Sequence, residues 1–205
     1  MAKHALGFRV KLGWATAVVL SGPASSPTVV HVRRIELSDP AVPDSRQPYH
    51  AVDDAEGDWE PDEARIAERV EIVRRVTGQS VGTLLKDCDA RRWTPASAGI
   101  VTGSLIDPSS IHQPHIRAHA MEGRLFRTSV EDVLRTHGLR CVVLGQKTAF
   151  RTASEAIHSR EDALKRRLTD LGRPIHGPWR ADEKFAALAA WVALSKDSND
   201  LRSSE

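Results

Sequence analysis

Cysteine, aromatic residues and long apolar runs are all scarce in this 205-residue chain. Its two cysteines, Cys88 and Cys141, lie far apart and belong to no CxxC pair, so neither a disulfide framework nor a zinc knuckle is indicated. We expect both to be buried thiols. No apolar run reaches the ~18 residues that cross a bilayer, and the first residues show no cleavable signal. We therefore expect a cytoplasmic protein without a membrane span.

The charge is small but unevenly distributed. Aromatic residues make up only 5% of the chain, which disfavours a base-stacking platform for single strands, and the net charge of +2 does not by itself indicate nucleic-acid binding. Residues 38–60, however, hold seven acidic residues against Arg46 alone, whereas residues 111–180 are basic and rich in histidine. The pattern is consistent with an acidic loop beside a basic half, or with ordinary solvated surface.

The hydrophobic pattern predicts one α/β domain over residues 1–195, with the acidic loop 38–60 inserted and a polar tail at 196–205. Strands are expected at 5–12, 14–20, 28–37, 98–103 and 140–144. Helices are expected from about 61 to 76, resuming after Gly78 to Leu85, and at 111–137, 159–171 and 182–194. The order β-β-β-α-β-α-β-α-α predicts a mixed sheet with helices on its faces.

This order resembles the ribonuclease H-like fold, and its spacing is most similar to RuvC-type resolvases and related nucleases. Residues 7–9 and 13–19 resemble the opening hairpin of that family, in which the first strand carries Gly-x-Asp. Residues 99–101 fall where the fourth strand carries a Glu, and 121–124 resemble the next small-residue-rich helix. Residues 182–190 resemble the last helix, Asp-x-x-Asp before an Ala/Leu run. The resemblance implies a mixed five-stranded sheet and a homodimer formed through helices.

The sequence departs from that family at the positions that would hold metal. The resemblance implies two divalent ions held by about four carboxylates, the oxygen ligands that hard cations need. Arg9, Val101 and Phe185 stand at three of those positions, and Asp182 is the one acid left. An arginine there would repel Mg²⁺, so two-metal cleavage is predicted to be lost. Related ATPases use an Asp-x-Gly hairpin, and residues 11–13 lack that Asp.

Arg9 and Lys11 share one face of the first strand, opposite its apolar side chains. If a helix covers that face, Arg9 needs an anionic partner, for which Glu122 or Asp182 are the candidates. An ion pair would then replace a metal centre. The alternative is an exposed strand end with solvated cations. Lys147 follows the fifth strand, where the resemblance places a lysine that approaches DNA.

A histidine-rich helix is the other notable motif. If it begins near Pro114, then His115, His119 and Glu122 fall at i, i+4 and i+7 on one face. Such a trio could hold zinc or another borderline metal, although the spacing is not HExxH. Near the helix N-terminus, His115, Arg117 and His119 could instead bind an anion such as phosphate. A structural role in helix capping and packing is the third interpretation.

We therefore predict a non-catalytic module that binds nucleic acid, a nucleotide phosphate or a partner protein, with no resident cofactor. The candidate binding residues are Arg9, Lys11, His115, Arg117, His119, Glu122, Arg124, Lys147 and Asp182. The alternative is a divalent-metal-dependent nuclease or hydrolase. Its ligands would be displaced acids among Asp107, Glu122, Asp182 and Glu183, or the trio His115, His119 and Glu122.

Overall fold

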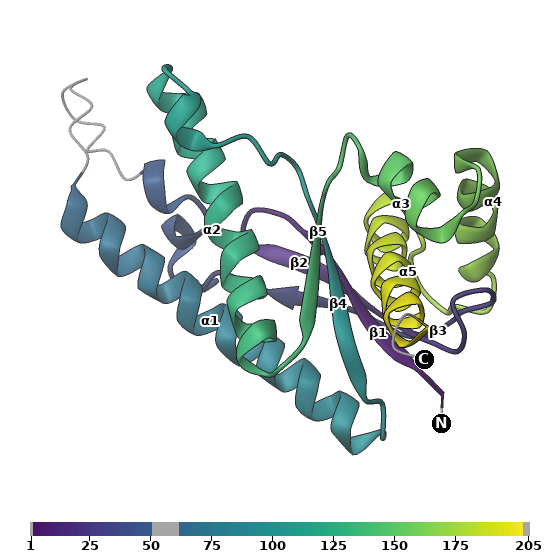
Figure 1. Ribbon diagram of the computed structural model, residues 1–205. Helices are drawn as coiled ribbons and strands as arrows, with labels where there is room; N and C mark the ends of the chain where they lie inside the picture. Colours follow the sequence, from purple (N-terminus) through teal and green to yellow (C-terminus); the bar gives the residue numbers. More distant parts are fainter. Residues whose placement is uncertain (1, 51–61, 203–205) are drawn as a thin grey trace.

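A five-stranded mixed sheet forms the centre of the computed structural model, which describes residues 2–50 and 62–202 (Figure 1). The strands are β1 (His4–Val10), β2 (Trp14–Ser21), β3 (Thr28–Glu36), β4 (Pro95–Thr102) and β5 (Arg140–Gly145). They are arranged in the order β3-β2-β1-β4-β5. β1 pairs antiparallel with β2 and parallel with β4, and β5 extends the parallel half. The predicted mixed α/β sheet is confirmed.

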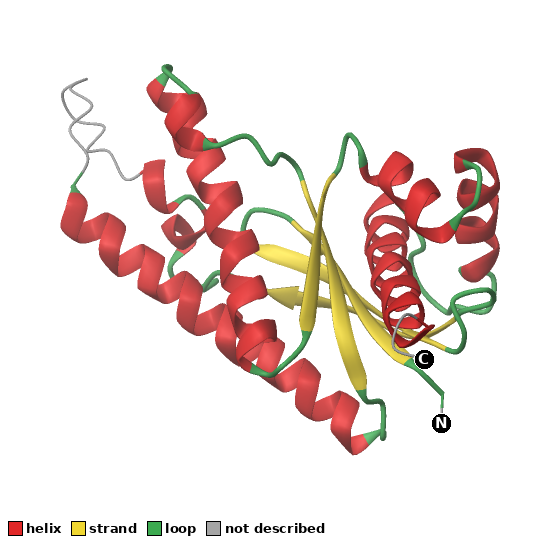
Figure 2. Ribbon diagram, in the orientation of Figure 1, coloured by secondary structure: helices red, strands yellow, loops and turns green. Residues whose placement is uncertain are grey.

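Helices cover both faces of this sheet (Figure 2). One layer contains α1 (Glu63–Ala90) and α2 (Pro114–Thr136), and the other contains α3 (Ala149–Ile157), α4 (Glu161–Leu171) and α5 (Ala181–Arg202). Phe8 and Val10 of β1 pack into the core beneath α1 and α2. Because side chains alternate along a strand, Arg9 between them faces the α5 layer.

α5 lies unusually close to β1 and β4. A Cβ atom added to Gly7 would lie 1.9 Å from the backbone oxygen of Ala186, and one added to Gly99 would lie 2.1 Å from that of Ala189. The helix residues 186–190 are completely buried. Glycine on the strands and alanine on the helix therefore allow backbone-to-backbone packing, which holds the first turn of α5 at the ends of β1 and β4.

The observed helices differ from the sequence expectation in three places. α1 runs unbroken past Gly78, because the buried Val81, Leu84 and Leu85 continue its apolar stripe and a helical glycine costs only ~1 kcal/mol. α3 was not predicted; it is short, and the left-handed His158 (φ 52°) ends it.

The third difference is the length of α5, which continues to Arg202, past the predicted end at 194. Asp197 lies in this extension and is only 7% exposed. It accepts a hydrogen bond from the Ser97 hydroxyl at 2.5 Å and pairs with Arg140. The contacts to β4 and β5 tie the extension to the sheet. Residues 51–61, which include the first residue of the expected 61–76 helix and the second part of the acidic loop, lie outside the described residues.

Both cysteines are free thiols, as expected, with Cys88 buried and Cys141 half-buried. Burial raises the pKa of each thiol to about 11. Arg91 beside Cys88 and Arg135 beside Cys141 act in the opposite direction, but burial has the larger effect on each pKa, so both thiols stay protonated near neutral pH. Within the described part of the chain, no helix is both long and apolar enough to span a membrane.

Candidate functional site

The parallel strands β1, β4 and β5 end at the same edge of the sheet. Arg9, next to last in β1, is the register partner of Val101 in β4, and Val101 is in turn the partner of Leu144 in β5. Gln146 follows β5 directly. The edge where parallel strands end is the usual position of binding sites in open α/β sheets.

Arg9 is the buried centre of this edge, with only 3% of its surface exposed. Its Nη1 donates to the backbone oxygen of Val10 at 3.1 Å and to that of Val101 at 3.4 Å. Its Nη2 donates to Oε1 of Gln146. Residues from three strand ends thus hold the guanidinium in a fixed orientation.

The first turn of α5 supplies the countercharge. Nε of Arg9 lies 3.6 Å from Oδ1 of Asp182, and Nζ of Lys11 lies 3.4 Å from the same oxygen. The ring of Phe185 lies under the guanidinium, with 5.7 Å between Cζ and the ring centroid. Burial lowers the pKa of Arg9, whereas the charge of Asp182 raises it. The guanidinium stays charged, because arginine does not lose its proton in proteins.

The structure therefore brings together all four positions at which the resemblance places metal-holding acids. Val101, Asp182 and Phe185 all contact Arg9. The expected ion pair of Arg9 with an acid is present, and its partner is Asp182. Glu122, the other candidate partner, binds elsewhere.

A cavity of about 280 Å³ opens beside this cluster, between the ends of β1 and β4 and the middle of α2. Its polar lining comes from Arg9, Lys11, Thr102, Ser104 and His119. Two hydroxyl groups, two cations and an imidazole are all groups that can donate hydrogen bonds to an anion. The rest of the lining is apolar, from Val10, Leu12, Ile106 and Ala120, so the cavity combines a few hydrogen-bond donors with a largely apolar wall.

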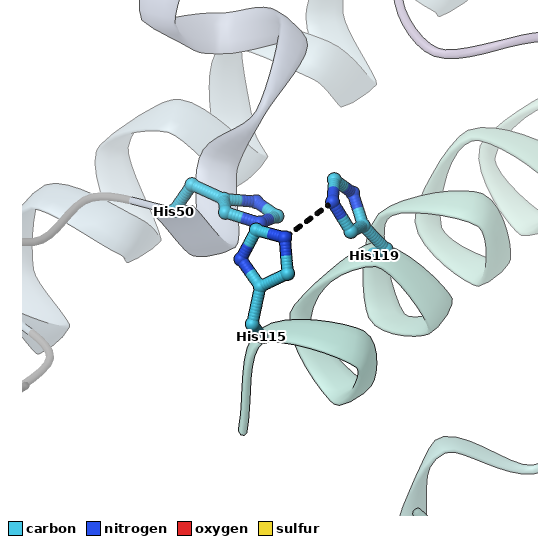
Figure 3. A group of neighbouring side chains, drawn as sticks. All are labelled: His50, His115 and His119. Atoms are coloured by element: carbon cyan, nitrogen blue, oxygen red, sulfur yellow. Dashed lines mark hydrogen bonds between the residues drawn. The ribbon is translucent and has the colours of Figure 1, made fainter. Parts of the chain in front are cut away.

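Three imidazoles form a second cluster on the α2 side (Figure 3). His115 and His119 lie on consecutive turns of α2, and His50 ends the short 3-10 helix at Pro48–His50. Nε2 of His119 lies 3.2 Å from Nε2 of His115, and the ring of His50 lies 4.2 Å from that of His119 between centroids. One potential ligand atom from each residue lies within 4.8 Å of the other two.

Glu122 lies behind these rings and is fully buried. Its Oε1 is 2.7 Å from Nδ1 of His50, and its Oε2 is 3.4 Å from Nδ1 of His119. Burial raises the pKa of Glu122, and the two imidazoles act in the opposite direction. The predicted grouping of His115, His119 and Glu122 on one helical face is present. Glu122 faces the Nδ1 atoms of two histidines.

The remaining candidates lie apart from these clusters. Arg117 donates from Nε to the backbone oxygen of Ile111 at 2.7 Å, and Arg124 pairs with Asp107 at 3.6 Å. Both arginines line a separate cavity of about 430 Å³ on α2. Lys147 is exposed just beyond β5.

The displaced acids of the alternative interpretation do not gather. Asp107 pairs with Arg124, and Oε2 of Glu183 accepts a hydrogen bond from the backbone nitrogen of Arg180 at 2.7 Å. Across residues 2–50 and 62–197, the histidine cluster is the one group of three or more metal-ligating side chains within reach of each other. The geometry therefore gives no support to a carboxylate-held pair of metals.

Sequence reasoning missed two residues of these clusters, His50 and Gln146. His50 lies in a proline-rich loop far from α2 in the sequence, where no periodic pattern relates it to His115 or His119. Gln146 follows the fifth strand immediately, and its position at a parallel strand end was the available signal.

No protein-family model matches the chain, and no curated protein matches it. Solved structures do. RuvC from Thermus thermophilus superposes with a TM-score of 0.52 at 12% identity, covering 96% of this chain and 96% of that one. RuvC from the same organism in complex with a Holliday junction substrate superposes with a TM-score of 0.55 at 10% identity, covering 97% and 96%. This chain has the fold of RuvC.

The RuvC fold confirms the ribonuclease H-like architecture expected from the order of the strands and helices. The structural similarity to RuvC extends over both helical layers, since nearly the whole length of each chain is aligned. Arg9 thus lies at the centre of a RuvC-like sheet, on the strand and in the layer where the resemblance places the first metal-holding acid.

Proposed function

We propose that this chain is a RuvC-like nucleic-acid-binding protein that holds a backbone phosphate at the strand ends without two-metal cleavage. The observation that carries the proposal is the buried, fully oriented guanidinium of Arg9 at the centre of the site. A fixed cation is suited to an anionic ligand and unsuited to a divalent metal.

The charge of Arg9 disfavours a divalent metal at this position. A divalent ion ~4 Å from Arg9 would be repelled by roughly 8 kcal/mol at an effective dielectric constant of ~20. The single carboxylate of Asp182 cannot offset the repulsion from both Arg9 and Lys11, so one net positive charge still faces the ion. The site would have to lose its central contacts before it could bind magnesium.

The net charge of Arg9, Lys11 and Asp182 favours a phosphate ligand. Arg9 and Lys11 are two cations facing one carboxylate, so the group keeps one positive charge. Lys11 is 38% exposed and lines the cavity, where it can reach a ligand. Arginine with its planar fork and lysine with its mobile ammonium are both common phosphate-binding groups.

Further cations extend beyond the cavity and favour a polymer over a single nucleotide. Lys147 is exposed beyond β5 at the same edge of the sheet, and Arg117 and Arg124 line the neighbouring cavity on α2. A nucleic-acid backbone presents phosphates at regular intervals and can engage several such groups together. The RuvC structure that holds a Holliday junction substrate supports nucleic acid as the ligand class.

The test is fluorescence anisotropy with labelled duplex, branched and single-stranded DNA and with RNA, at low and moderate salt. Each sample is then run on a gel, with and without Mn²⁺. We expect binding that weakens as salt rises, and intact substrate in every lane. Lys11→Met should weaken binding, whereas Lys86→Met, at an exposed position near the far end of α1, should not.

Two outcomes would overturn this function. Binding that is indifferent to salt would contradict phosphate contact. Cleavage that needs Mn²⁺ would mean that acids elsewhere in the chain assemble a nuclease site.

A further inference from the structure

The proposed function rests on Arg9 and Lys11 and gives no role to His50 or His115, although His119 also lines the cavity. The three histidines come from two separate segments, the 3-10 helix Pro48–His50 and α2, yet their rings are in mutual contact. We propose that His50, His115 and His119 bind one divalent transition-metal ion of the zinc class, with Glu122 orienting the ligands. This site is independent of the proposed function and is tested without nucleic acid.

Glu122 determines which nitrogen atoms of His50 and His119 are free to bind a metal ion. As a carboxylate it accepts the Nδ1 proton of His50 at 2.7 Å and faces Nδ1 of His119 at 3.4 Å. With the proton on Nδ1, the neutral imidazole carries its lone pair on Nε2. A buried carboxylate behind metal-binding histidines is the arrangement that fixes the tautomer and raises ligand basicity.

Nε2 of His50 is buried and has no hydrogen-bond partner. A buried polar atom without a partner costs roughly 1–3 kcal/mol, and an ordered water or a bound ion can satisfy it. His4 and His31 also have such a nitrogen, but neither belongs to a cluster of metal-ligating side chains among the described residues. The His50 atom belongs to a ring packed 4.2 Å from His119 and 5.0 Å from His115 between centroids. A shared cation would satisfy it.

The spacing of the nitrogens suits a tetrahedral ion. Zn–N bonds of about 2.0–2.1 Å place two tetrahedral ligands about 3.3 Å apart. The Nε2 atoms of His115 and His119 are 3.2 Å apart, one helical turn from each other. With His50 the cluster spans at most 4.8 Å, so a small inward movement of the His50 ring would complete a three-nitrogen set.

The donor type selects the metal. Imidazole nitrogen is a borderline ligand that favours zinc and its transition-metal neighbours, whereas magnesium and calcium require oxygen. Three protein ligands leave a fourth position for water or an anion. Because His119 also lines the cavity of Arg9 and Lys11, the ion would lie beside that cavity.

The experiment measures metal binding directly on the full chain, purified without a polyhistidine tag and stripped with a chelator. Zn²⁺ is titrated by calorimetry, and bound metal is counted by elemental mass spectrometry after dialysis. Co²⁺ is then added as a spectroscopic probe. We expect one Zn²⁺ per chain, competition by Co²⁺ with the visible bands of a tetrahedral site, and no competition by Mg²⁺.

Variants separate this site from adventitious binding. His119→Ala and His50→Ala should each weaken Zn²⁺ binding at least ~100-fold. Each variant removes one of the three imidazole ligands, and the two that remain are too few to hold the ion. Glu122→Gln should weaken it about 10- to 100-fold, the usual effect of losing the carboxylate behind a ligand. His112→Ala is the matched control: it removes an exposed histidine from the same segment and should change nothing.

His115 is exposed, so His115→Ala tests the site without disturbing the core. Circular dichroism of each variant establishes that it is folded. Failure of the wild-type chain to retain stoichiometric Zn²⁺ would overturn the proposal. So would equal affinity in folded His115→Ala and wild-type protein, or an equal loss in His112→Ala.

Discussion

Nε of Arg9 lies 3.6 Å from Oδ1 of Asp182, and this ion pair joins the first strand of the sheet to the first turn of the last helix. The resemblance to RuvC-type resolvases places two metal-holding acids at these positions. Here one of the two residues is a cation, so the pair is held together by its own charges. This edge of the sheet therefore needs no divalent metal to hold Asp182, because Arg9 and Lys11 supply its counter-ions.

Replacing Arg9 with methionine should destabilise the protein by about 2 kcal/mol. The change removes the guanidinium contacts to Val101 and Gln146. It leaves Asp182 with Lys11 as its remaining cation; Asp182 is 28% exposed, so the cost is smaller than for a fully buried pair. Urea unfolding measures the difference. Lys11→Met should cost less than ~1 kcal/mol, and equal stability of Arg9→Met and wild type would contradict this account.

The salt dependence of nucleic-acid binding should report how many phosphates the protein contacts. Lys11→Met should reduce the slope of log K against log salt by about 1, and Lys147→Met should do the same if it contacts the backbone. The measurement is a series of anisotropy titrations from low to moderate salt. An unchanged slope for Lys11→Met would remove that side chain from the interface.

Gly7→Ala should destabilise the protein by about 3 kcal/mol, because its Cβ would overlap the backbone oxygen of Ala186 at 1.9 Å. The displaced helix would also separate Asp182 from Arg9. Gly82→Ala is the control: nothing lies within 4 Å of its Cβ, so it should stabilise α1 by about 0.5–1 kcal/mol. Thermal or urea unfolding compares the two, and similar effects at both glycines would contradict the close packing.

Alkylation of Cys141 should be slow at mildly alkaline pH and should rise with a midpoint near pH 11. Burial raises the pKa of this thiol from 9.0 to about 11, so its thiolate fraction near pH 8 is about 100-fold lower than in the unfolded chain. Mass spectrometry after timed iodoacetamide treatment of Cys88→Ser protein gives the rate. A midpoint near pH 9 in the folded protein would show that the thiol is solvated.

Local patterns in the sequence predicted well which side chains share a face of a strand or helix. Alternation of apolar and charged residues placed Arg9 opposite Phe8 and Val10, and the resemblance of the last helix placed Asp182 within its reach. Helical spacing also placed His115 and His119 on one face. Each of these relationships depends on short-range periodicity or on the order of the strands.

The parts that could not be predicted depend on contacts between distant segments. His50 joins α2 through the packing of a proline-rich loop, for which no repeat or spacing gives a signal. The partner of Glu122 could not be chosen either, since both Arg9 and a histidine were chemically suitable. The extension of α5 rests on Asp197 meeting Ser97 and Arg140, which are remote in sequence.

The close packing of Gly7 against Ala186 also has a consequence for how the chain acquires its structure during synthesis. β1 is made first, but the helix that covers one of its faces comes from the other end of the described chain. A nascent chain that has not yet released residues 181–197 would therefore expose the apolar underside of the sheet. Folding of the sheet edge that carries Arg9 is expected to wait for that late segment, and ribosome-bound intermediates would be the forms most in need of chaperones.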